Sequence, residues 1–127
     1  MRKILLFICM VPSFAFAQLW DELITTKSNI KYLIDTASIQ KTGDIVKYAQ
    51  LSNYPNGYAS DNQSIHSIQQ IKEIDCKNEM IKTVSMIAYE GENAKGGIIN
   101  LSVGRDYQWA KVNQNSVSSI YMDEVCK

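Results

Sequence analysis

The sequence is poor in the residue types that most enzymes and metal sites require. Its 127 residues include one histidine, His66, and three cysteines, and no Gly-x-Ser-x-Gly nucleophile motif occurs. A lone imidazole and scattered cysteines lack the paired ligand spacing of zinc sites, so we expect no metal and no cofactor. His66 could act as a general base only if Asp75 or Asp61 lay beside it, and a surface imidazole is the simpler interpretation. We therefore predict that the protein is not an enzyme.

An excess of one charge and long apolar runs are also missing. The 13 basic and 13 acidic residues cancel, whereas a nucleic-acid-binding protein needs a basic face, so we expect no nucleic-acid partner. The apolar run Ile4–Val11 is shorter than the roughly 20 residues that cross a bilayer, so no retained transmembrane segment is expected. Six glycines and two prolines are too few for a low-complexity chain, which leaves one small globular domain.

Residues 1–17 have the pattern of a secretory signal peptide. A basic start precedes the apolar run, and Ala15 and Ala17 place small residues before a cleavage ahead of Gln18. Cys9 falls inside the run, after the bulky Ile8, so we do not expect lipid attachment. The signal predicts export to the periplasm, the medium or the cell surface.

Cleavage would leave residues 18–127, a domain with 11 basic and 13 acidic residues and a net charge of about −2. It would also leave Cys76 and Cys126 as the only cysteines. An even pair in an oxidising compartment favours a disulfide, and two free thiols are the alternative.

Apolar and polar residues alternate along most of this domain, which is typical of β-strands. Strands are predicted over residues 29–35, 44–54, 80–90 and 98–103. The segment 64–76 is ambiguous because isoleucine recurs at every third residue, between the strand period and the helix period. Its β-branched residues favour a fifth strand.

The period changes near the C-terminus. Val117, Tyr121 and Val125 fall on one helical face, and Ser116 can cap the helix. The predicted fold class is α+β: a single antiparallel sheet of about five to six strands with a C-terminal helix packed on it. A Cys76–Cys126 disulfide would tether that helix to the sheet.

Aromatic residues provide the best candidates for a binding surface. Tyr54, Asn56 and Tyr58 lie in the polar loop 53–64, and tyrosine with small polar neighbours is typical of protein-binding surfaces. The other interpretation places the aromatic rings in the core, and we expect this for three of them: Tyr32, Trp109 and Tyr121.

An ordered set of residues resembles the surface-adhesin protein E family of Gram-negative bacteria. The set consists of Trp20, the segment Tyr32-Leu33-Ile34-Asp35, Asp75-Cys76, Trp109 and the closing Cys126. The resemblance implies an antiparallel sheet with a disulfide-tethered helix, exposure on the cell envelope, and binding of host extracellular-matrix or serum proteins. The competing hypothesis is a periplasmic inhibitor or immunity-type protein that blocks an enzyme.

Overall fold

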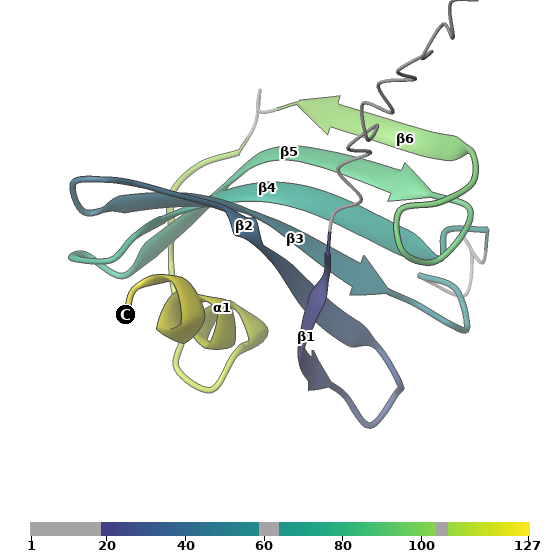
Figure 1. The fold of residues 1–127 in the computed structure, drawn as a ribbon, viewed down its shortest axis with the longest axis horizontal. Helices are drawn as coiled ribbons and strands as arrows, with labels where there is room; N and C mark the ends of the chain where they lie inside the picture. The colour runs from purple at the N-terminus through teal and green to yellow at the C-terminus, as the bar shows by residue number, and fades with distance from the viewer. Residues whose placement is uncertain (1–18, 59–63, 104–106) are drawn as a thin grey trace, which may run out of the picture.

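A computed structural model describes residues 19–58, 64–103 and 107–127 (Figure 1). The predicted signal peptide, residues 1–17, lies outside this part of the chain.

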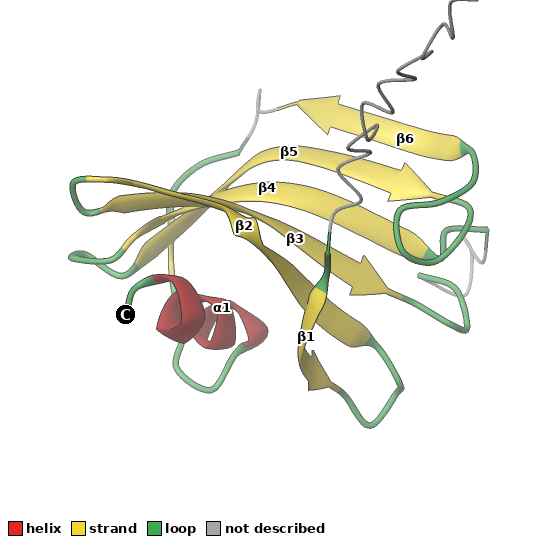
Figure 2. Ribbon diagram, viewed as in Figure 1, coloured by secondary structure: helices red, strands yellow, loops and turns green. Residues whose placement is uncertain are grey.

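The described residues form one antiparallel sheet and one C-terminal helix (Figure 2). Six strands follow one another across the sheet in chain order, and a seventh, short strand pairs with β5. The elements are β1 (Asp21–Thr25), β2 (Lys31–Thr42), β3 (Ile45–Asn53), β4 (Ser67–Asp75), β5 (Met80–Tyr89), β6 (Ile98–Val103), β7 (Ala110–Lys111) and α1 (Val117–Val125). The predicted α+β fold is confirmed, with β1 and β7 added to the five strands read from the sequence.

β2 extends well beyond the predicted end at Asp35. Its pairing with β3 breaks between Asp35 and Gln40, where β2 has more residues than β3. Within this bulge the Ser38 Oγ accepts a hydrogen bond from the backbone N–H of Ala49 at 2.8 Å. A side chain thus replaces the missing ladder partner, and the strand continues to the turn at Gly43.

The isoleucine spacing in β4 follows from a sheet with apolar groups on both faces. Val46 of β3 pairs with Ile74, and Ser52 pairs with Ile68, so these residues share the face that α1 covers. Ile71 has the opposite parity and lies on the other face. Isoleucine recurs at every third residue because β4 supplies apolar side chains to both faces of the sheet.

Two apolar clusters lie on the helix-covered face. The larger cluster packs the helix against β2, β3 and β4; its buried members are Ile34, Val46, Tyr48, Ile74, Tyr121 and Val125. The smaller cluster lies toward the other end of the strands and contains Ile65, Ile68 and Ala88. The helix therefore covers only one end of this face, as Figure 1 shows.

Local signals and long-range contacts both fix α1. Ser116 accepts a hydrogen bond from the Ser119 N–H, and the Ser119 side chain accepts one from the Ser116 N–H, which completes a capping box. Tyr121 and Val125 are buried, as the helical face predicted from the sequence requires. No helix in the described ranges is long and apolar enough to cross a membrane.

Candidate functional site

The predicted binding loop begins with an ordered turn. The Gly57 N–H donates to the Tyr54 carbonyl at 3.0 Å, which closes a four-residue turn. Pro55 occupies the second position and Gly57, with φ 86°, the last, as expected for a β-turn of this kind. The Tyr58 N–H then donates to the Ile65 carbonyl at 2.9 Å. The backbone that carries the candidate side chains is therefore held at both ends.

Tyr54 and Tyr58 form an aromatic pair on this turn. Their ring centroids are 5.1 Å apart and the rings meet edge to face at 82°. Tyr54 is half-buried and packs against the smaller apolar cluster, whereas Tyr58 is 52% exposed. Asn56 is exposed between them. The structure thus brings the three predicted residues together, with Tyr54 as the anchor and Tyr58 as the accessible ring.

Burial is the main cause of the raised pKa values of Tyr54 and its neighbour Tyr32. The pKa of Tyr54 is raised to about 12, chiefly by burial, while a hydrogen bond with Ser52 lowers it and the neighbouring Tyr32 and Tyr58 add to the rise. Burial and the nearby Tyr58 also raise the pKa of Tyr32. The phenols of Tyr54 and Tyr32 are therefore neutral at physiological pH and offer hydroxyl groups together with apolar ring surface.

A second turn, residues 91–97, is fixed beside this loop. The Asn53 and Asn93 side chains are joined at 2.9 Å, and the Asn93 N–H donates to the Asn53 Oδ1 at 2.8 Å. Ser67 donates its hydroxyl to the Gly91 carbonyl at 2.5 Å and accepts from the Ala94 N–H at 3.0 Å. Local sequence patterns do not reveal these contacts, because they join residues about 25 to 40 positions apart.

The aromatic residues expected in the core divide into three cases. Tyr121 is buried, as predicted, and Tyr32 is partly buried against the larger cluster. The prediction for Trp109 was wrong, because its side chain is 38% exposed. Trp109 precedes the two-residue β7, and the Lys82 ammonium lies 5.0 Å from its ring centroid. The Trp109 ring therefore packs against a lysine of the neighbouring strand β5 and does not enter the core.

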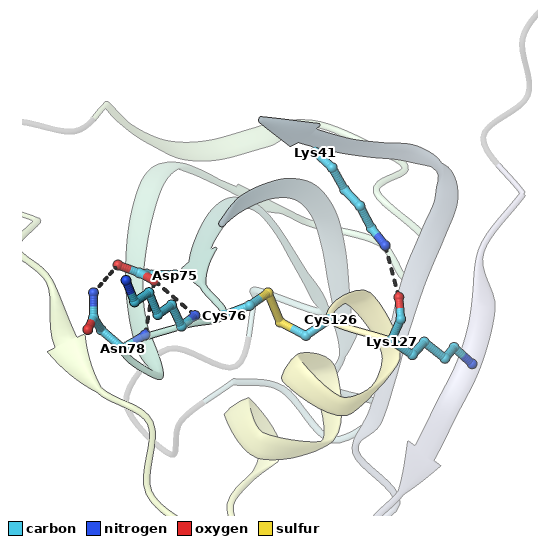
Figure 3. Close-up of a disulfide and its surroundings, with 7 residues drawn as sticks. Lys41, Asp75, Cys76, Asn78, Cys126 and Lys127 are labelled. Carbon is cyan, nitrogen blue, oxygen red and sulfur yellow. Dashed lines mark hydrogen bonds between the residues drawn. A yellow bond between two sulfur atoms is a disulfide. The ribbon is translucent and has the colours of Figure 1, made fainter. Parts of the chain in front are cut away.

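His66 does not form the pair with Asp75 that a catalytic role would need. Its Nδ1 lies 2.7 Å from the Glu90 carbonyl oxygen. The Asp75 carboxylate instead accepts hydrogen bonds from Asn78 and Lys77, which lower its pKa (Figure 3). Asp61 lies outside the described residues. Within the described ranges, no group of three potential ligands could hold a metal ion.

The far end of the sheet carries the predicted disulfide. Cys76 follows β4 and Cys126 follows α1, and their Cα atoms are 5.7 Å apart in the bonded pair (Figure 3). Lys41 Nζ donates to the Lys127 carbonyl at 2.9 Å beside it. This end fixes the helix, while the tyrosine turn lies at the opposite end of the strands, beyond Asn53.

Comparison with known proteins identifies related chains. A family model described as Surface-adhesin protein E matches residues 20–127. Crystal form II of Haemophilus influenzae protein E aligns with a TM-score of 0.63 at 16% identity, covering 84% of this chain and 86% of that one. Protein E from non-typeable Haemophilus influenzae aligns with a TM-score of 0.55 at 17% identity, covering 83% and 74%. The structural likeness concerns the fold, and none of the curated proteins compared matches the chain.

Proposed function

This chain belongs to the surface-adhesin protein E family, and we propose that it is an exported, non-enzymatic module that binds a host extracellular-matrix or serum protein. The contact surface in this proposal is the turn that carries Tyr54, Asn56 and Tyr58. Residues 1–17 would direct export and then be removed, and the Cys76–Cys126 disulfide is consistent with an oxidising destination.

The accessible ring of Tyr58 on a fixed backbone is the observation that carries the proposal. An exposed tyrosine gives a large contact area and loses little side-chain entropy on binding, because only two torsions need to be fixed. Its partner Tyr54 is anchored in the smaller apolar cluster, so the pair is held in place before a ligand arrives.

The direct test is binding of the purified, disulfide-bonded protein to immobilised basement-membrane extract and to serum proteins. We expect saturable binding that weakens about tenfold or more in Tyr58→Ala, as for a central aromatic contact. Trp109→Ala is the matched control, since it removes another partly exposed ring at the disulfide end of the sheet. Absence of saturable binding, or equal loss in both variants, would contradict the proposed surface.

The inhibitor hypothesis uses the same turn against a bacterial enzyme. Affinity capture from periplasmic extract separates the two functions, because an inhibitor would recover one enzyme in stoichiometric amount. An adhesin would recover none and would retain binding to host protein. Cell fractionation with an intact-mass measurement checks the cleavage after Ala17, the disulfide and the compartment together.

A further inference from the structure

A band of polar side chains crosses the helix-covered face between the two apolar clusters. This polar strip consists of Gln50 on β3, Gln70 and Lys72 on β4, and Thr83 on β5. Gln50 pairs with Gln70, and Lys72 pairs with Thr83, in the strand register. Clusters of buried apolar residues flank the strip on both sides along the strands.

Lys72 is a partly buried cation that forms no ion pair with any acidic residue in the described part of the chain. Its Nζ donates to the Thr83 Oγ1 at 2.6 Å. On β3 its register partner is Tyr48. The next residue along β4, Glu73, points to the other face of the sheet. The ion pair found in the described part of the chain joins Lys127 to Glu124 and does not include Lys72. Burial lowers the pKa of Lys72, as expected for an ammonium group without a counter-charge.

Gln70, two residues away on the same face, has an unused acceptor. Its Oε1 is buried without a hydrogen-bond partner, and its Nε2 contacts the Met86 Sδ at 3.6 Å. Buried polar atoms are nearly always paired, and a lysine is almost never fully buried unless it is paired, so a partly buried ammonium group is stabilised further by a negative charge. The polar strip therefore contains a cation without an anion and an acceptor without a donor. A ligand that pairs with both must carry a negative charge and a hydrogen-bond donor.

We propose that the polar strip binds a small carboxylate with an N–H group next to it, as in an N-acylated amino acid. The carboxylate accepts from Lys72 Nζ, and the ligand N–H donates to Gln70 Oε1. Gln70 and Lys72 are two residues apart on β4, so their side chains are neighbours on the same face of the sheet. A fully charged phosphate fits less well, because it offers no donor to the Gln70 oxygen.

The test is a titration of the disulfide-bonded protein with N-acetylglycine, followed by the backbone N–H signals of Gln70, Lys72 and Thr83. Acetate retains the charge but lacks the N–H, and N-acetylglycinamide retains the N–H but lacks the charge. We expect saturable shifts with N-acetylglycine and an affinity weaker by about tenfold or more for each control compound. Acetate loses the hydrogen bond to the buried Gln70 Oε1, and N-acetylglycinamide loses the negative charge that pairs with Lys72. No saturable shift, or equal affinity for all three compounds, would overturn the proposal.

Two variants, with Lys47→Met as a control, locate the site. Lys72→Met removes the cation and should abolish binding, whereas Lys47→Met removes a lysine from the opposite face and should leave binding unchanged. Gln70→Glu supplies a carboxylate beside Lys72 within the chain, so it should abolish ligand binding and raise the thermal midpoint. If Lys72→Met fails to fold, Gln70→Glu decides the outcome: unchanged ligand affinity in that variant overturns the assignment.

Discussion

The hydroxyl group of Tyr121 on the C-terminal helix donates a hydrogen bond to the backbone carbonyl of Leu33 on β2 at 2.7 Å. The same ring stacks on Tyr48 of β3, with centroids 5.5 Å apart and planes inclined by 24°. One side chain thus joins the helix to two strands of the sheet. Burial raises the pKa values of both Tyr48 and Tyr121, which keeps their hydroxyl groups protonated as donors.

Tyr121→Phe should test the value of this hydrogen bond. The ring stacking is retained and only the donor is lost, so we expect the free energy of unfolding to fall by about 1–2 kcal/mol. Urea denaturation followed by circular dichroism measures the change. Tyr58→Phe is the matched control, because that ring is largely exposed and its change should stay within about 0.5 kcal/mol. Equal effects in the two variants would show that the bond to Leu33 contributes nothing.

Cys126→Ser should lower the free energy of unfolding by roughly 2–5 kcal/mol, since the disulfide closes a loop between positions 50 residues apart. Denaturation with and without a reducing agent provides the internal comparison. The reducing agent should destabilise the natural protein and leave the variant unchanged. A natural protein insensitive to complete reduction would contradict the predicted contribution.

Ser116→Ala should weaken α1 at its start. The change removes the acceptor for the Ser119 N–H and half of the capping box, at a cost of about 1 kcal/mol. Ser118→Ala provides the control inside the same helix, where alanine has the higher helix propensity and should cause little loss. Thermal unfolding of the two variants side by side measures the difference, and equal midpoints would rule out the cap.

The raised pKa of Tyr54 predicts that the protein loses stability at high pH. Its pKa is about 12 in the folded protein and near 10.0 in the unfolded chain. Its contribution is therefore complete below pH 10 and falls as the pH rises through 12, because the unfolded chain releases the proton first. The difference in unfolding free energy between the natural protein and Tyr54→Phe should shrink over this interval. Taking the difference removes the titration of lysines, including Lys72, whose lowered pKa acts in the opposite direction. A constant difference from pH 9 to pH 12 would contradict the shift.

Much of the fold could be predicted from local sequence patterns. Alternation identified β3 and β5, and the apolar face with its Ser116 cap identified α1, because these signals lie within a few neighbouring residues. β1 and β7 were missed for a physical reason. They have five and two residues, and short strands are stabilised by their partners more than by their own alternation.

The candidate site was predictable only in part. Polar loop composition identified Tyr54, Asn56 and Tyr58, but the division into a buried anchor and an exposed ring depends on the smaller apolar cluster. The exposure of Trp109 could not be read from its type, since a large ring fits a core or a surface equally well. The partners of Lys72 in the described sheet, Tyr48 and Thr83 instead of an acid, depend on strand register, which no local pattern encodes.

The bond between Cys76 and Cys126 makes a closed covalent ring of the chain that contains β5, β6, β7 and α1. A protease that cuts once inside this ring, for example in the exposed turn 91–97, opens the ring without separating the pieces. The helix would stay attached to β4 through sulfur after the backbone between them had been broken. Resistance to fragmentation is thus a property of the connectivity, in addition to the packing.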